Sequence, residues 1–250
     1  MRTIEGVFEE ALALILGFEP RISVAGRTDA GVHASGQVAS FTASEGCDPG
    51  RVQRGLNTML APEVVIRSAR LAAAGFDARH SATGREYVYR IDTASLPDAF
   101  TARFVWHRPG PLKVGPMRTA ARSLAGDHDF ASFCRAPRLP ASTRRVLRRL
   151  VVSTAGQEVR VRATADGFLH QMVRSLVGTL VAVGEGRIQA DSMPEILAAR
   201  TRAAAGPVAP PQGLALVRVF YGRRPGAART TAQASSTTAE TSLTTAGMPR

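Results

Sequence analysis

The sequence predicts an α+β fold with two similar lobes, each built from an antiparallel or mixed sheet and helices, and with an active-site cleft between the lobes. Segments of helical and of strand periodicity alternate along the chain. Some consecutive strands follow each other closely enough to pair as hairpins, which favours α+β over a parallel α/β sheet. The length of 250 residues suffices for one large domain or two small ones.

Helices and strands alternate in the first half of the chain. Apolar residues at helical spacing predict an amphipathic helix over residues 4–16 that ends near Gly17. Asp48 followed by Pro49 marks the start of a second helix, because Asp is a favoured N-cap and Pro fits the first helical position. Extended segments are expected over residues 21–25, 37–41, 64–72 and 86–92.

The second half continues this alternation. Helices are expected over residues 116–124, 168–183 and 194–201, and strands over 146–154, 157–165 and 214–221. After Tyr221 the composition shifts to Thr, Ala, Ser, Gly and Arg, which cannot bury enough apolar area to offset the entropy of ordering. We therefore expect an N-terminal lobe over residues 1–95, a C-terminal lobe over 96–221 and a disordered tail over 222–250.

The chain carries a formal net charge of +12, which indicates a polyanionic partner, usually nucleic acid. Residues 222–250 hold four arginines and one glutamate, so +3 of that charge lies there. The competing interpretation is a compositional bias, because 31 of the 32 basic residues are arginine. Charge alone leaves both interpretations open.

Cysteine usage and hydropathy predict a cytoplasmic protein. The two cysteines form no CxxC pair, which is typical of a reducing compartment. No apolar run reaches the roughly 18 residues that a membrane helix needs. Glu5 and Glu9 stand where a signal peptide would be basic. The five histidines form no HxH or HExxH pattern, so we expect no metal site.

Asp29 is a candidate for chemistry because it lies among small and turn-forming residues in "AGRTDAGVHASGQV". The alternative is an aspartate that only stabilises a turn. An aspartyl phosphatase would carry a second Asp two positions on, where this chain has Gly31. A glycosidase needs a partner carboxylate, and spacing picks none out.

Three further stretches allow both a functional and a structural interpretation. Arg174 lies at the edge of the apolar face of the helix over 168–183, with His170 one turn before it, and its stem could simply cover apolar surface. Tyr87 is typical of a half-buried strand tyrosine. The segment over residues 76–80 combines an aromatic with basic residues, as in RNA contacts, or is an ordinary loop.

Together, five blocks resemble the bacterial tRNA pseudouridine synthase A family in order and spacing, over about residues 2–221. They are "GRTDAGVHASGQV", "FDARHSATGREYVYRI", "GDHDFASFC", "FLHQMVRSLVGTLVAVGEG" and "AGPVAPPQGLALVRV". The resemblance implies isomerisation of uridine to pseudouridine in the anticodon stem-loop of tRNA, at positions 38, 39 and 40. It also implies the two-lobed pseudouridine synthase fold, a homodimer, and neither cofactor nor metal.

The resemblance also implies a role for each matching residue. Asp29 matches the catalytic nucleophile and Arg174 the arginine that pairs with it. Tyr87 matches the tyrosine that stacks on the target base, and Leu214 an apolar residue that lines the base pocket. The residues that match other RNA contacts are Arg27, which helps to turn the base out, and Phe76, Arg79 and His80. Asp29 could attack C1′, attack C6 or promote formation of a glycal, and the sequence leaves these routes open.

Two other functions compete with an RNA isomerase. An RNA-binding protein without catalysis is disfavoured because Asp29, Tyr87 and Arg174 are all present. A nucleic-acid hydrolase is disfavoured because a second carboxylate and metal ligands are not recognisable.

The start of the chain also departs from the family pattern. Relatives usually begin with a strand and loop resembling "YDGTxFxGWQ" before the stretch that here spans residues 2–6. We therefore expect the first strand of the family to be missing, with unpaired strand edges left in the first sheet. Losing about three inward-facing apolar side chains, at roughly 1.5–3 kcal/mol each, would make the chain poorly soluble or weakly active.

Overall fold

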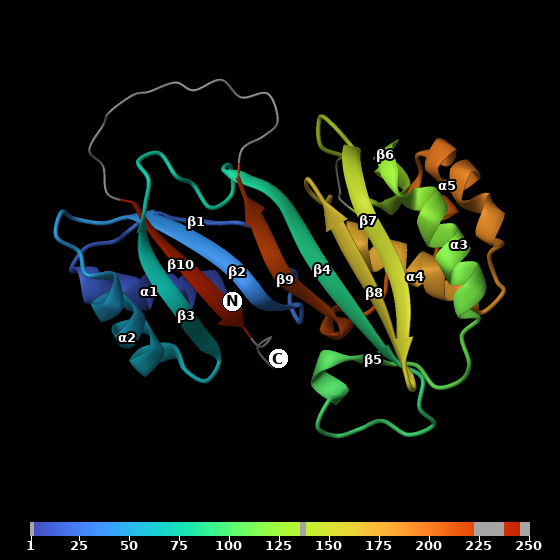
Figure 1. The fold of residues 1–250 in the computed structure, drawn as a ribbon, viewed down its shortest axis with the longest axis horizontal. Helices are drawn as coiled ribbons and strands as arrows, with labels where there is room; N and C mark the ends of the chain where they lie inside the picture. Colours follow the sequence, from blue (N-terminus) through green and yellow to red (C-terminus); the bar gives the residue numbers. More distant parts are fainter. Residues whose placement is uncertain (1–2, 136–138, 223–237, 246–250) are drawn as a thin grey trace. The chain divides into compact units, whose positions relative to one another are not determined.

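The computed structural model describes residues 3–135 and 139–222, together with the backbone of residues 238–245 (Figure 1). Its contacts divide the chain into two units. The first unit comprises Met1–Thr28, His33–Thr83 and Val217–Arg250, and the second comprises Asp29–Val32 and Gly84–Leu216. We expected a boundary at residue 95, which differs from this division. The difference arises because residues 85–92 pair with a strand of the second unit, so strand pairing outweighs position in the sequence.

The first unit combines two helices with antiparallel strand pairs. The helices are α1 (Ile4–Leu16) and α2 (Pro49–Leu60), and the strands are β1 (Ile22–Val24), β2 (His33–Thr42), β3 (Val64–Ala72) and β10 (Thr238–Thr245). The strand order is β3-β10-β2, and β1 also pairs with β2. Strand β9 (Leu214–Tyr221) begins in the second unit and continues into the first.

Local sequence explains where the two helices begin and end. The side chain of Thr3 caps α1 by accepting a hydrogen bond from the N–H of Gly6 at 3.1 Å. Gly17 ends α1 with a φ of 78°, a left-handed conformation that glycine adopts without steric cost. Asp48 caps α2 and accepts from the N–H of Gly50 at 2.8 Å, and Pro49 is the first helical residue. The bounds expected for α1 and the start expected for α2 agree with the structure.

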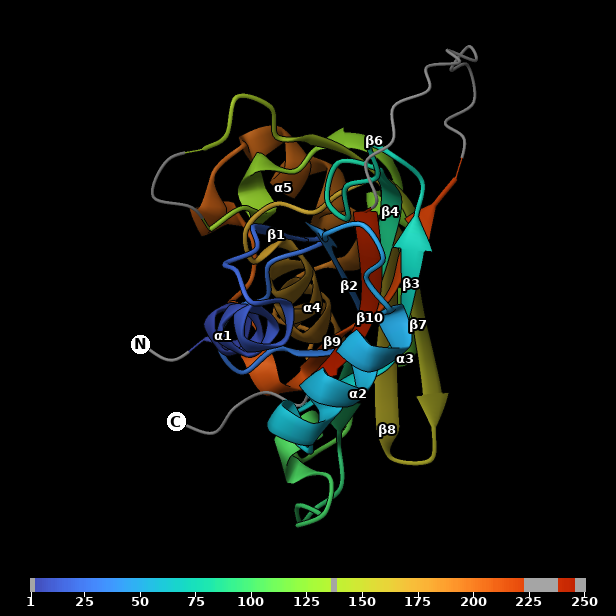
Figure 2. The same cartoon turned by 90° about the vertical axis from the view of Figure 1, so that its left-hand side faces the viewer.

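The core of the first unit lies between the two helices and the strands, and Figure 2 shows α1 and α2 lying together. Phe8 and Leu12 of α1 and Leu56 of α2 are almost fully buried there. Phe41 of β2 and Ile66 of β3 close the cluster from the sheet side. The amphipathic periodicity read from the sequence thus places its apolar side chains in the core.

Strand β10 is a correction to two expectations. We expected residues 222–250 to be disordered, whereas residues 238–245 form a strand; residues 223–237 and 246–250 lie outside the described part. We also expected bare strand edges in this sheet, but β10 pairs antiparallel with both β2 and β3, between which it lies in Figure 1. Its backbone can form hydrogen bonds on both sides, and its four threonines favour extended structure, so hydrophobic composition is a poor guide here.

The second unit contains three helices and five strands among its described residues. The helices are α3 (Val114–Leu124), α4 (Met172–Gly184) and α5 (Met193–Ala199), and the strands are β4 (Ala82–Asp92), β5 (Trp106–His107), β6 (Gly126–Asp129), β7 (Arg144–Ala155) and β8 (Glu158–Ala165). The strand order is β4-β8-β7-β6, all antiparallel, and β5 pairs parallel with β4. Helix α3 packs against β7, α4 and α5.

The expected β7–β8 hairpin is present, but the start of α4 differs from the expectation. We expected this helix to begin at residue 168, whereas it begins at Met172. Gln171 has a φ of 55°, in the left-handed region, so the chain turns before the helix starts. His170 therefore lies in the turn that precedes α4 rather than on its surface.

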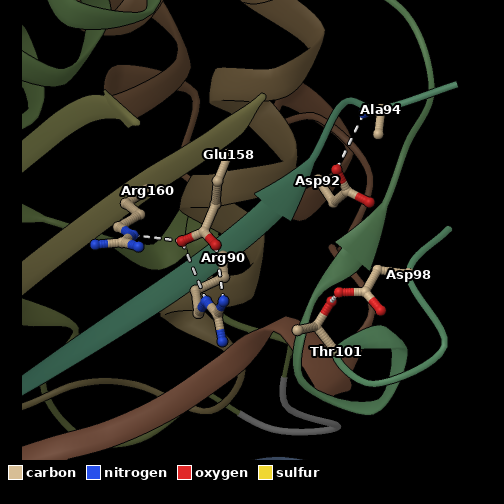
Figure 3. A network of polar contacts seen from close by, with 7 residues as sticks. All are labelled: Arg90, Asp92, Ala94, Asp98, Thr101, Glu158 and Arg160. Carbon is tan, nitrogen blue, oxygen red and sulfur yellow. Dashed lines mark hydrogen bonds and ion pairs between the residues drawn. The ribbon is translucent and has the colours of Figure 1, made fainter. Parts of the chain in front are cut away.

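An ion-pair network links β4 to β8 (Figure 3). The guanidinium of Arg90 donates two hydrogen bonds to Glu158, at 3.1 Å from Nε to Oε1 and 2.7 Å from Nη2 to Oε2. Arg160, which lies two residues along β8 from Glu158 and directly opposite Arg90, also binds Glu158. The hydrogen bonds from Arg90, followed by that from Arg160, lower the pKa of the Glu158 carboxyl despite its partial burial. The network thus joins the two strands through a charged carboxylate.

No helix in the described ranges is both long and apolar enough to cross a membrane.

Candidate active site

Asp29 lies at the first position of a tight turn in the second unit. The N–H of Val32 donates to the carbonyl oxygen of Asp29 at 3.0 Å, which closes the turn over Ala30 and Gly31. Gly31 has a φ of 81°, and a Cβ built on it would lie 3.1 Å from Cγ of Pro211. The left-handed φ favours glycine there, and a side chain would also crowd Pro211, so Gly31 helps to set the backbone that presents the Asp29 carboxylate.

Arg174 projects from the first turn of α4, and all the remaining residues of this helix are buried. Its Nε donates to the carbonyl oxygen of Ala209 at 2.8 Å, and its own carbonyl oxygen accepts from the N–H of Ala209 at 3.1 Å. The segment at Ala209 lies very close to the helix, because a Cβ on Gly178 would be 1.7 Å from the carbonyl oxygen of Pro207. Arg174 is thus anchored on both its backbone and its side chain.

The guanidinium of Arg174 donates from Nη1 to Oδ2 of Asp29 at 2.6 Å. The Arg174 side chain is 12% exposed and that of Asp29 is 26% exposed. A charge-assisted hydrogen bond of this kind contributes about 1.5–3 kcal/mol, and a buried charge left without its partner is costly. The site therefore holds an oriented carboxylate that remains accessible from one side.

Tyr87 and Leu214 lie in the second unit, as Asp29 and Arg174 do. Tyr87 of β4 is buried, and its ring meets the ring of Phe168 edge-on at 5.2 Å between centroids. Burial raises the pKa of Tyr87 to about 12, and the nearby charge of Asp29 contributes to that rise. Leu214 is buried at the first position of β9, directly after Gly213, where a side chain would meet the ring of Tyr89.

Comparison with known proteins gives a consistent result. A family model described as tRNA pseudouridine synthase matches residues 120–222. The proteins named tRNA pseudouridine synthase A from Rhodopseudomonas palustris (strain BisA53) and Acidiphilium cryptum are 43% and 45% identical over 220 and 222 residues. Each comparison covers 88% of this chain, and 89% and 87% of the two relatives. The relative from Sinorhizobium medicae is 42% identical over 222 residues.

The chain belongs to the tRNA pseudouridine synthase A family. The residues that the family model matches, 120–222, include Arg174 and Leu214 and do not include Asp29 and Tyr87. Among the described residues of this family member, no group of three or more His, Cys, Asp and Glu side chains is placed to hold a metal ion.

The remaining residues of this tRNA pseudouridine synthase A family member that we expected to contact RNA lie in the first unit. Arg27 is exposed and follows Gly26, whose backbone is held on both sides by the amide of Gln37. Nε2 of Gln37 donates to the carbonyl oxygen of Gly26 at 2.6 Å, and Oε1 accepts from its N–H at 3.2 Å. Gln37, which the sequence did not single out, lies in the same "GRTDAGVHASGQV" block as Arg27.

The segment over residues 76–80 divides into a packed part and an exposed part. The ring of Phe76 packs against Tyr221 at 5.0 Å between centroids, in a cluster with Ala25, Val38 and Ala78. Phe76 thus packs within the first unit, and its expected contact with RNA stays a prediction. Arg79 and His80 are exposed, and their backbone N–H groups donate to Oδ1 of Asp77 at 2.8 and 2.7 Å.

His170 is a second residue that sequence analysis did not assign to the site of this family member. Its Nε2 lies 3.6 Å from Oδ1 of Asp29, the carboxylate oxygen that does not receive the hydrogen bond from Arg174. The sequence placed His170 one turn before Arg174 within an expected helix over residues 168–183, whereas in the structure it precedes α4. The turn at Gln171 directs it to Asp29 instead.

Proposed function

We propose that this chain isomerises uridine to pseudouridine in tRNA and that Asp29 is the nucleophile. The observation that supports this best is the 2.6 Å ion pair between Arg174 and a turn-mounted Asp29, in a chain of the tRNA pseudouridine synthase A family. Relatives carry that name. We further propose that the substrate is the anticodon stem-loop of tRNA, modified at positions 38, 39 and 40. The enzyme is proposed to act in the cytoplasm as a homodimer.

The reaction needs a carboxylate near the sugar and a surface that holds the detached base. It needs no redox group, because the substrate and product are isomers. The C1′–N1 bond breaks, the uracil turns, and a C1′–C5 bond forms. C5 loses a proton and N1 gains one, so that substrate and product are isomers. Asp29 acts on the nucleotide through its accessible side, while the partly buried Arg174 holds Oδ2 in a fixed orientation.

Tyr87 supplies the surface on which the base rests. Stacking of a base on an aromatic ring contributes about 1–3 kcal/mol. The edge-on contact with Phe168 supports the ring of Tyr87 from one direction. Since burial raises the pKa of Tyr87 to about 12, the phenol stays neutral and does not repel Asp29 at working pH.

The net charge of +12 supports a tRNA substrate. Extracting a base from a stem costs a few kcal/mol, and contacts from basic residues to phosphate can offset that cost. The exposed Arg27 and Arg79 of the first unit are proposed as two such contacts.

The test compares the wild-type protein with Asp29→Asn on unmodified tRNA transcripts. Asn keeps the shape of the side chain and removes the nucleophile, so turnover should be abolished while tRNA affinity stays within a few-fold. Carbodiimide modification followed by primer extension locates pseudouridine, and stops are expected at positions 38–40 with the wild type alone. Residual turnover above about a tenth of wild type in Asp29→Asn would contradict the role of Asp29, and wild-type protein that binds but never modifies tRNA would contradict the activity.

A further inference from the structure

The segment over residues 209–211 contacts both sides of the candidate ion pair. The carbonyl oxygen of Ala209 accepts a hydrogen bond from Nε of Arg174 at 2.8 Å. Two residues on, the ring of Pro211 lies against the turn that presents the carboxylate, because a Cβ built on Gly31 would lie 3.1 Å from its Cγ. All of these residues belong to the second unit. One short segment therefore adjoins both the guanidinium and the turn that carries the carboxylate.

Tyr89 of β4 holds the middle of this segment. Its hydroxyl donates to the carbonyl oxygen of Pro210 at 2.7 Å, and its side chain is fully buried. The ring is confined on two sides. Trp106 meets it edge-on at 6.2 Å between centroids, and a Cβ on Gly213 would lie 2.6 Å from its Cε1. The ring thus has little room to turn, and the direction of its hydroxyl is set by packing.

The proline at position 210 couples this hydrogen bond to the carbonyl group of Ala209. Pro210 has a φ of −54° and a ψ of 151°, and its pyrrolidine ring locks φ. Because peptide bonds are planar, the two carbonyl groups on either side of the Pro210 Cα can then turn relative to each other only through ψ. Holding the oxygen of Pro210 therefore restricts the direction of the Ala209 oxygen, which is the acceptor for Arg174.

The phenol of Tyr89 is suited to this position because it stays neutral. Burial raises the pKa of Tyr89 above its ordinary value, and the nearby charge of Arg174 opposes part of that rise. A neutral hydroxyl donates a hydrogen bond without adding a negative charge. Tyr89 thus holds the segment without competing with Asp29 for the guanidinium.

We propose that Tyr89 is a positioning residue for Arg174. Its hydroxyl holds Pro210 and thereby fixes the carbonyl oxygen of Ala209. That oxygen directs the guanidinium of Arg174 at the carboxylate of Asp29. This inference rests on the proposed function. Because the hydroxyl acts through Arg174 and not on the substrate, its loss should slow turnover without weakening tRNA binding.

The kinetic test compares two variants that each lose one phenol hydroxyl. Tyr89→Phe keeps the ring, and we expect kcat to fall about three- to tenfold with KM for tRNA unchanged, the range that one neutral hydrogen bond supports. Tyr221→Phe is the matched control, because the Tyr221 hydroxyl donates to the carbonyl oxygen of Ala78 at 2.7 Å in the first unit. It should keep kcat within about twofold of wild type. A wild-type kcat in Tyr89→Phe, a change in KM alone, or an equal loss of kcat in both variants would overturn the proposal.

An NMR measurement reads the arginine directly, without turnover. The Nε–H of Arg174 is hydrogen-bonded, so in ¹⁵N-arginine-labelled protein its proton should exchange slowly with water; its signal is assigned by its loss in Arg174→Lys. In Tyr89→Phe this exchange should quicken by about threefold or more, because the acceptor is no longer held, whereas in Tyr221→Phe it should not change. Unchanged exchange in Tyr89→Phe would refute the inference even if the enzyme modifies tRNA. Faster exchange in that variant alone would sustain it even if the substrate were another RNA.

Discussion

The side chains of Arg174 and Asp29 meet at 2.6 Å although they are 145 residues apart in the sequence. Two local structures bring them together. A turn that Gly31 helps to set presents the carboxylate, and a helix packed closely against the segment at Ala209 presents the guanidinium. The pair is therefore a product of tertiary packing, and any change in either local structure should affect the site.

Replacing Arg174 by lysine should separate the charge of this residue from its geometry. Arg174→Lys keeps a cation but loses the fork that donates both to Asp29 and to the carbonyl oxygen of Ala209. We expect kcat to fall by about tenfold or more and the free energy of unfolding to fall by about 1–3 kcal/mol. Arg122→Lys, on the exposed face of α3, is the matched control and should change neither quantity. Wild-type turnover in Arg174→Lys would show that charge alone suffices.

Tyr87 provides a test of stacking. Tyr87→Phe keeps the ring and should retain most of the tRNA affinity, whereas Tyr87→Ala should lose about 1–3 kcal/mol of binding. Since the pKa of Tyr87 is raised to about 12, the phenol does not ionise below about pH 10, and Tyr87→Phe should leave the shape of the pH–rate profile unchanged. Filter binding and initial rates across pH measure both effects. If Tyr87→Phe binds as poorly as Tyr87→Ala, the ring is not a stacking surface.

Acid should weaken the link between β4 and β8. Because hydrogen bonds from Arg90 lower the pKa of Glu158 in the folded state, the folded protein binds fewer protons there than the unfolded chain. The resulting stability is present above the ordinary glutamate value, about 4.3, and is lost as pH falls through the lowered folded value. Glu158→Gln should lower the free energy of unfolding by about 1–2 kcal/mol near pH 7 and by less near pH 3. Urea unfolding at both values measures this, with the exposed Glu10→Gln as control; a cost independent of pH would contradict the assignment.

Strand β10 can be tested through its backbone. Thr241 pairs with Ala39 of β2 and with Ala69 of β3, so it lies inside the sheet. Thr241→Pro removes an N–H from an interior strand, a place where proline is rarely tolerated. We expect the melting temperature of the full chain to fall, by about 2–4 °C for each kcal/mol of unfolding free energy that the substitution removes. Thr241→Val keeps the backbone and should melt like the wild type. Identical melting of Thr241→Pro would show that β10 does not contribute to this sheet.

Periodic segments were predictable from the sequence, and the unpatterned ones were not. The end of α1 follows from Gly17, and the start of α2 follows from Asp48 and Pro49. Strand β6, Gly126–Asp129, was missed because its polar residues show no alternation; it forms because it pairs with β7. The helix expected from residue 168 begins only at Met172, because the left-handed conformation of Gln171 is not visible in hydrophobic periodicity.

The candidate site was recognised in part by resemblance rather than by spacing. Asp29 alone suggests only a turn, and Arg174 alone suggests a surface arginine. Their contact depends on a fold that local patterns do not specify. For Phe76 the sequence allowed an RNA contact or an ordinary loop, and its packing with Tyr221 is a tertiary contact that no local pattern predicts.

The position of β10 has a consequence for synthesis on the ribosome. The strands it joins, β2 and β3, leave the ribosome early, while β10 follows only after the whole second unit has been made. Residues 84–216 are continuous and can fold as the chain grows, but the first unit must wait for its last strand. During that interval two strand edges face each other without a partner and are exposed to association with other chains. Slower elongation over residues 84–216 should therefore lower the soluble yield, and chaperones that shield strand edges should restore it.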